Sequence, residues 1–134
     1  MTLSGHDPRM ETETDLEFYE LFANKEELLP PWLRLRSEIA SYGDGVQVRR
    51  RDRHAEFARR GSEFLIAEPT ADETLELGLH NPGLPYDKRF REAVGFGPRR
   101  ITHRVFLPED ALIDDELHAR LHAAYALALE GKSA

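Results

Sequence analysis

Residues 46–79 read VQVRRRDRHAEFARRGSEFLIAEPTADETLELGL, and this stretch decides the fold. Apolar and polar residues alternate from Val46 onward, with the period of two that is typical of a half-buried β-strand. Short turns at residues 52–53, 60–61 and 70–73 divide the stretch into four strands, and residues 101–107 supply a fifth. Consecutive strands joined by short turns predict an antiparallel meander.

Segments with the residue spacing of helices precede and follow the strands. Thr14 and Glu17 have the spacing of a capping box, and two helices follow, separated by the prolines at residues 30–31. Acidic residues at 114–116 open a C-terminal helix that ends at Gly131. The order predicts an α+β domain with two N-terminal helices, a five-stranded, mainly antiparallel sheet and a C-terminal helix packed on one sheet face. We expect one domain over residues 14–131 and a disordered tail over residues 1–13.

Residues 80–99 interrupt the strand pattern with several glycines and prolines. Tyr86, Phe90 and Val94 recur at every fourth residue, which predicts a short helix over residues 87–93 inside this loop. A loop of this length in a compact domain is often functional. We therefore expect Tyr86, Arg89 and Phe90 to contribute to a binding surface.

The composition excludes several classes of protein. The chain has 134 residues, a net charge of −7 and no cysteine. The absence of cysteine excludes disulfides, thiolate metal sites and cysteine nucleophiles, and it fits a reducing compartment. No apolar run is long enough to span a membrane, and the first residues lack the pattern of a signal peptide. These features predict a cytoplasmic protein with no membrane partner.

The arginines of the strand region follow the polar parity of the strands. Arg49, Arg51 and Arg104 point away from the apolar residues, and so do Glu56 and Glu76. Arg104 joins the others only if the fifth strand returns beside the first or the fourth. The side chains either form cross-strand ion pairs, which we favour because the glutamates neutralise the arginines, or hold an anion in a shallow site. The residues of this candidate surface are Arg49, Arg51, His54, Glu56, Glu76 and Arg104.

Histidines offer the other candidates for chemistry. His103 shares the parity of the apolar face, which is typical of a hydrogen-bonded core histidine, and the alternative is a proton-transfer group. His118 and His122 have metal-ligand spacing, but Ala119 stands where a zincin requires glutamate and no third ligand is evident. The sequence therefore predicts no metal site. It also predicts no cofactor, because the glycines at residues 95–97 do not complete a nucleotide-binding motif.

Several motifs resemble those of an uncharacterised bacterial family that is catalogued as a domain of unknown function. The motifs are HAEFA at residues 54–58, FLIAEP at 64–69, LELGL at 75–79, THRV at 102–105 and AY at 124–125. The resemblance covers roughly residues 20–129, and the family is distantly similar to small YdhG-like α+β domains. It implies the same order of helices and strands, and it supplies no established activity or catalytic residues.

Together these features predict a binding or interaction module and no catalytic residues. We expect the open sheet face and residues 80–99 to hold a small anion, an acidic peptide or a second copy of the chain. One alternative is a nucleic-acid accessory domain, although the sequence pI near 5.4 argues against it. The other alternative is a small enzyme with His103 as acid or base, which would need a second polar group and a cavity beside the ring.

Overall fold

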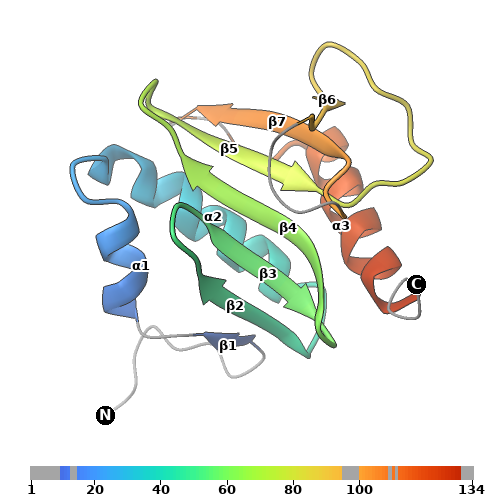
Figure 1. Ribbon diagram of the computed structural model, residues 1–134, viewed down its shortest axis with the longest axis horizontal. Coiled ribbons are helices and arrows are strands. Elements are labelled where there is room, and N and C mark those ends of the chain that lie inside the picture. Colours follow the sequence, from blue (N-terminus) through green and yellow to red (C-terminus); the bar gives the residue numbers. More distant parts are fainter. Residues whose placement is uncertain (1–9, 13–14, 95–99, 109, 111, 131–134) are drawn as a thin grey trace.

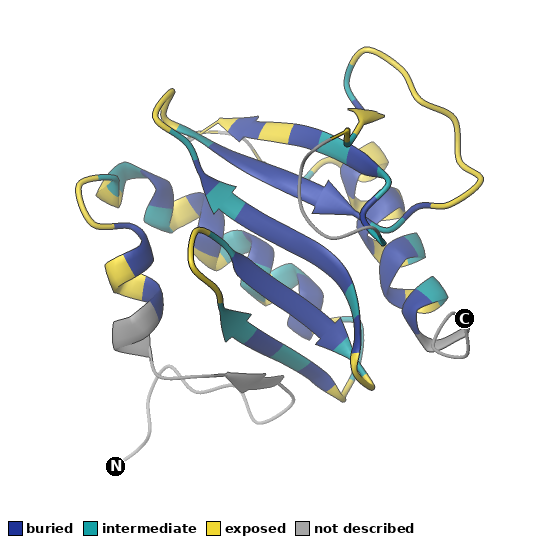
Figure 2. Ribbon diagram, viewed as in Figure 1, coloured by how far each residue is buried: buried dark blue, intermediate teal, exposed yellow. Residues whose placement is uncertain are grey.

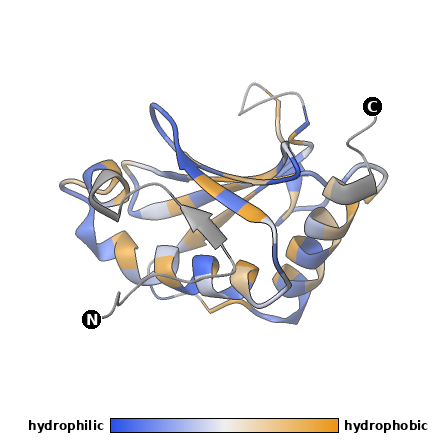
Figure 3. Cartoon of the chain, turned by 90° about the horizontal axis from the view of Figure 1, so that it is seen from below, coloured by the Kyte–Doolittle hydropathy of each residue, from blue (hydrophilic) through white to orange (hydrophobic). Residues whose placement is uncertain are grey.

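The computed structural model describes residues 10–12, 15–94, 100–108, 110 and 112–130. A twisted sheet forms one layer, and the helices lie together on one of its faces (Figures 1 and 3). The elements are β1 (Met10–Thr12), α1 (Asp15–Leu21), η1 (Glu26–Leu28), α2 (Leu29–Ala40), β2 (Val46–Arg50), β3 (Ala55–Arg59), β4 (Ser62–Pro69), β5 (Thr74–Leu79), β6 (Arg91–Glu92), β7 (His103–Pro108) and α3 (Asp115–Glu130). None of the described helices has the length and apolar character that a membrane crossing needs.

The strands lie in the order β1-β2-β3-β4-β5-β7-β6. The predicted meander is confirmed as β2 to β5, and β7 returns beside β5, antiparallel to it. The predicted count of five strands was too low, because β1 and β6 have only three and two residues and show no periodicity. β1 pairs in parallel with β2 and lies within the predicted tail, whose other residues lie outside the described part of the chain.

The predicted helix over residues 87–93 does not form. The carboxylate of Asp87 closes a turn instead, accepting hydrogen bonds from the backbone N–H groups of Arg89 and Phe90 at 2.9 and 2.7 Å. The next two residues then pair with β7 as strand β6. The recurrence of Tyr86, Phe90 and Val94 misled the prediction, because only Phe90 is buried and the other two side chains are exposed.

The ends of the helices agree with the sequence where the structure describes them. The Oδ1 atom of Asp114 accepts the N–H of Leu117 at 2.9 Å and begins α3 among acidic residues, as predicted. Helix α2 begins with the prolines and ends at Ala40, before Gly43. The predicted capping box at Thr14 and the helix end at Gly131 lie outside the described residues.

One hydrophobic core fills the space between the sheet and the helices. Trp32 lies at its centre, fully buried, with ring centroids 5.5 Å from Phe18 and 5.6 Å from Phe57. Leu77 of β5 and Leu121 of α3 belong to the same cluster. Figure 2 shows this burial concentrated in the central strands, with exposed residues at the turns.

A bulge in β4 changes which residues face the helices. Ala58 of β3 pairs with Glu63, whereas the preceding residue of β3 pairs with Leu65, so Phe64 is an extra residue on β4. The ring of Phe64 lies 6.0 Å from that of Tyr125 on α3, and Leu65 also joins the core. Glu63 therefore lies beside Ala58 on the face away from the helices.

Candidate functional site

The sheet face away from the helices carries the charged residues that parity placed there. Arg49 is the cross-strand partner of Glu56, and Arg104 is the partner of Gly78. Glu56 and Glu76 are each only 7% exposed. Gly78 is itself buried.

Ion pairs balance most of the charge on this face. Arg51 lies just beyond β2, and both its Nε and its Nη2 lie 2.7 Å from Oε1 of Glu56. Arg104 pairs with Glu76 through an Nε–Oε2 contact of 2.6 Å. Arg49 donates to the neutral side chain of Gln47 at 2.7 Å. The ion-pair interpretation thus describes two of the three predicted arginines.

A pair of carboxyl groups lies within this network. The carboxyl of Glu63 shares a hydrogen bond with Glu56, and this bond together with burial raises the pKa of Glu63 to about 7. Burial alone would raise the pKa of Glu56, but hydrogen bonds from Glu63 and Arg51 hold it below its ordinary value. Burial lowers the pKa of the neighbouring His54. The two glutamates therefore share one proton near neutral pH.

Replacing Glu63 by Gln should change stability in a pH-dependent way. The pKa of Glu63 is about 7 in the folded protein against an ordinary 4.5, so folding takes up protons between these values. Ionisation of Glu63 therefore lowers the free energy of unfolding as the pH rises through 7. Glu63→Gln removes that loss and should be more stable than the wild type by about 1 kcal/mol at pH 8, after solvent screening, and by only about a quarter of that amount at pH 5.

Urea denaturation at the two pH values measures this difference. Glu73→Gln is the matched control, because Glu73 is exposed at the β4–β5 turn. The control should leave stability unchanged at both pH values. A difference between Glu63→Gln and wild type that is the same at pH 5 and pH 8 would contradict the shared proton.

Two arginines lie directly opposite each other where β6 meets β7. Arg91 and Arg104 are cross-strand partners, and their guanidinium carbons lie 5.3 and 5.8 Å from the centre of the Phe106 ring. Phe106 is 39% exposed. Among the described residues, no acidic side chain pairs with Arg91. We call Arg91, Arg104 and Phe106 the β6–β7 edge cluster.

Sequence analysis missed Phe106 of the β6–β7 edge cluster. Phe106 shares the parity of Arg104, so an exposed aromatic residue on that face could have been noticed. Arg91 falls within the helix predicted over residues 87–93, from which it could extend the arginine surface. Its pairing with Arg104 was not predicted, because a strand of two residues has no visible period.

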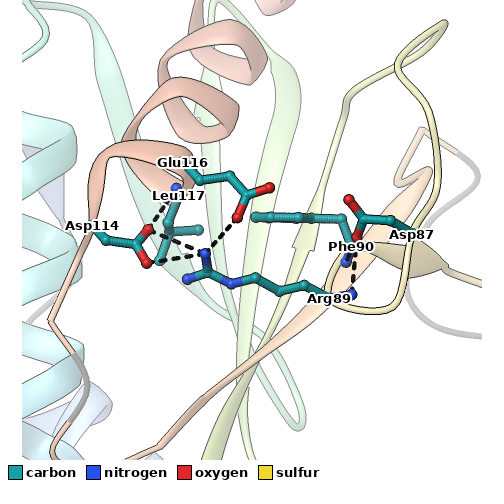
Figure 4. Close-up of polar contacts among 6 residues, drawn as sticks. All are labelled: Asp87, Arg89, Phe90, Asp114, Glu116 and Leu117. Carbon is teal, nitrogen blue, oxygen red and sulfur yellow. Dashed lines mark hydrogen bonds and ion pairs between the residues drawn. The ribbon is translucent and has the colours of Figure 1, made fainter.

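Residues 81–90, which we call the 81–90 segment, are fastened to the start of α3. Nη1 of Arg89 lies 3.0 Å from Oδ2 of Asp114 and 2.8 Å from Oε1 of Glu116 (Figure 4). Hydrogen bonds from the N–H groups of Phe90 and Arg89 lower the pKa of Asp87. Arg89 and Phe90, which were predicted to bind a partner, thus anchor this segment to the helix.

His103 lies on the helix side of β7, beneath the 81–90 segment, and is 1% exposed. Its Nε2 lies 3.1 and 3.3 Å from the carbonyl oxygens of Leu84 and Pro85, and its Nδ1 lies 2.6 Å from Oγ1 of Thr102. Because carbonyls only accept, Nε2 carries the proton and Nδ1 accepts from the hydroxyl. Burial lowers the pKa of His103, which favours this neutral ring. Both nitrogens therefore have partners within the fold.

Arg120 and Asn81 complete the buried layer around His103. Arg120 is 9% exposed, lies 4.5 Å above the ring of Phe90 and donates from Nη2 to the carbonyl of Pro85 at 3.0 Å. Asn81 is fully buried and donates to the carbonyl of Arg120 at 3.1 Å. Sequence reasoning missed both residues, although position 120 falls on the buried stripe of α3, three residues after position 117.

A second polar group joins α2 to α3. Oε2 of Glu38 accepts the hydroxyl of Tyr42 at 2.6 Å and pairs with Nδ1 of His118. Burial and the carboxylate raise the pKa of Tyr42.

No three metal-ligating side chains gather anywhere in the described part of the chain. A cavity of about 350 Å³ beside this group is lined by Arg34, Ser37, Glu38, Ser41 and Ile113.

Comparison with known proteins identifies a family and no activity. A family model described as "Domain of unknown function (DUF5655)" matches residues 19–128. No curated protein and no solved structure matches the chain significantly. The function must therefore be inferred from the geometry described above.

Proposed function

The chain belongs to the DUF5655 family of unknown function, and from its geometry we propose a non-enzymatic, cytoplasmic binding module for an anionic partner. The proposed contact surface is the β6–β7 edge cluster. The observation that carries the proposal is the pairing of Arg91 directly opposite Arg104 beside the exposed ring of Phe106. Glu76 balances the charge of Arg104, whereas no acidic side chain of the described residues pairs with Arg91, so a bound anion would supply the counter-charge that Arg91 lacks there.

An acidic peptide is the partner that fits this surface best. The guanidinium group of Arg91 can donate to a carboxylate, and the exposed ring of Phe106 beside it adds apolar contact that a small inorganic anion would not use. The rest of the sheet face is less suited to bind such a peptide. There Arg51 is already paired with Glu56, so it adds little to binding.

The two alternatives have less support. Of the arginines that a nucleic-acid interface would use, Arg51, Arg89 and Arg104 are each paired with carboxylates. An enzyme would need a reactive ring at His103, whose nitrogens are both hydrogen-bonded within the fold. Bacterial origin and similarity to YdhG-like domains stay predictions of the sequence.

Charge reversal at Arg91 tests the proposal. Arg91→Glu should weaken binding of a fluorescent oligoglutamate peptide by about tenfold or more, because one charge-assisted contact becomes a repulsion. Fluorescence anisotropy at low and high salt measures the affinity. Arg53→Glu is the matched control, since Arg53 is exposed at the β2–β3 turn and its reversal changes the net charge equally.

Four outcomes contradict the proposal. One is the absence of peptide binding by the wild type, and another is equal weakening by Arg53→Glu and Arg91→Glu. Sedimentation that shows a dimer broken by Arg91→Glu would instead make a second copy the partner. Binding of duplex DNA with a log–log salt slope of about −0.9 per phosphate contact would favour the nucleic-acid alternative.

A further inference from the structure

Arg120 is a buried cation that has no carboxylate partner among the residues that the structure describes. It lies on the buried face of α3 at 9% exposure, and no acidic side chain of the described residues is within ion-pair distance. The carboxylate of Asp87 acts on it only through space and is bound to the backbone N–H groups of its own turn. Buried charges in proteins are normally paired or hold a ligand, because desolvation of a charge is costly.

The guanidinium of Arg120 and the ring of His103 converge on one oxygen atom. Nη2 of Arg120 lies 3.0 Å and Nε2 of His103 lies 3.3 Å from the carbonyl oxygen of Pro85. The carbonyl oxygen of Leu84 lies 3.1 Å from the same ring nitrogen. The backbone of the 81–90 segment thus places two acceptor oxygens where the two oxygens of a carboxylate or phosphate group could bind.

Two further polar atoms in this layer have no partner among the described residues. They are Nη1 of Arg120, a donor, and Oδ1 of Asn81, an acceptor. Asn81 is fully buried, and its amide nitrogen donates to the carbonyls of His80 and Arg120. Unsatisfied buried polar atoms are uncommon in folded proteins, and the free donor Nη1 of Arg120 is capacity that an anion could use, whereas the free acceptor of Asn81 is not.

Tyr86 separates this layer from a neighbouring cavity. The Tyr86 ring lies 4.4 Å from the ring of His103, and its side chain is 52% exposed. The cavity has a volume of about 200 Å³ and is lined by Tyr86, Glu92, Ala93, Val94, Ile101 and Thr102. That volume is below the roughly 300 Å³ of pockets for drug-sized ligands, so it suits an anion of a few heavy atoms.

We propose that the donors of His103 and Arg120 form a binding site for a small oxyanion, a carboxylate or a phosphate, which enters beside Tyr86. The carbonyl groups of Leu84 and Pro85 occupy its donors in the closed form that the structure shows. Asn81 and Phe90 are buried and hold the two ends of the 81–90 segment, whereas residues 82–88 between them are exposed. The ion pairs of Arg89 are also exposed and contribute little stability, so this middle part can open while the two ends stay in place.

This site is distinct from the β6–β7 edge cluster. Glu92 pairs with His103, whereas its neighbour Arg91 pairs with Arg104. Successive residues of a strand point to opposite faces, so the two sites lie on opposite faces of the same sheet edge. The buried site can therefore fail its test while the surface proposal stands, and the reverse also holds.

Acetate and inorganic phosphate are the probes for the site. We expect at least one of them to raise the melting temperature of the wild type and to shift the NMR signals of the His103 ring and the Arg120 Nε–H group. Tyr86→Ala should bind the same probe more tightly, because it removes the side chain that covers His103. Arg120→Met should weaken binding by about tenfold or more, since a charge-assisted donor is lost. Arg53→Met, at the exposed β2–β3 turn outside both proposed sites, is the matched control and should bind as the wild type does.

The two probes also separate the two ligand classes. A response to acetate alone assigns a carboxylate, and a response to phosphate alone assigns a phosphate. The proposal is overturned if neither probe shifts the His103 and Arg120 signals, whether in the wild type or in Tyr86→Ala. It is equally overturned if Arg120→Met keeps the wild-type affinity. Because the NMR test uses the native arginine, it decides the matter even if Arg120→Met does not fold.

Discussion

Leu77→Ala and Leu121→Ala should each lower the free energy of unfolding by about 2–5 kcal/mol. Both side chains are fully buried in the core that joins β5 to α3, so each truncation removes apolar burial and leaves a cavity. Urea denaturation monitored by the fluorescence of Trp32 measures the loss. Leu33→Ala is the matched control: Leu33 lies on α2 but is 46% exposed, and its truncation should cost less than about 1 kcal/mol. Equal midpoints for Leu121→Ala and Leu33→Ala would refute the assignment of the core.

Arg104→Met should destabilise the protein by about 2–4 kcal/mol, because it leaves the carboxylate of Glu76 nearly buried and without its guanidinium partner. Arg49→Met is the matched control on the same face. It removes a hydrogen bond to the neutral side chain of Gln47 and should cost less than about 1 kcal/mol. Denaturant midpoints of the two variants at neutral pH give the comparison. A loss for Arg104→Met no larger than that for Arg49→Met would show that the ion pair is dispensable.

The same ion pair limits how the sheet face can be tested for function. Charge reversal at Arg104 or Arg51 would place a carboxylate beside Glu76 or Glu56, both of which are nearly buried. Loss of binding in such variants would then be confused with loss of the fold. Arg91 is exposed and unpaired with acids among the described residues, which makes it the better position for the binding experiment.

Periodicity in the sequence predicted the parts of the fold that are long and regular. The alternation from Val46 placed the meander, and the apolar spacing around Trp32 and Leu121 placed α2 and α3 against it. The parity of His103 also correctly placed this ring on the helix side of the sheet. The short strands β1 and β6 and the turn at Asp87 were not predicted, because a few residues contain no period.

The site residues that were not predicted from the sequence come together only through contacts between segments that are distant in the sequence. Glu63 reaches Glu56 only because the bulge at Phe64 shifts the alternation of β4. Arg120 meets the carbonyl of Pro85 across 35 positions of sequence. The spacing of residues within one helix or strand shows which of its side chains share a face. It does not show how two such elements pack together, and these contacts depend on that packing.

The contact between Glu38 and His118 joins residues 80 positions apart, and it has a consequence for the order in which the chain can fold. The hairpins of the meander pair residues close in sequence, so they can form as soon as they leave the ribosome. Helix α3 is synthesised after every strand that it covers. The apolar face of the nascent sheet, including Leu77, therefore stays open to water and to chaperones until α3 emerges and closes it.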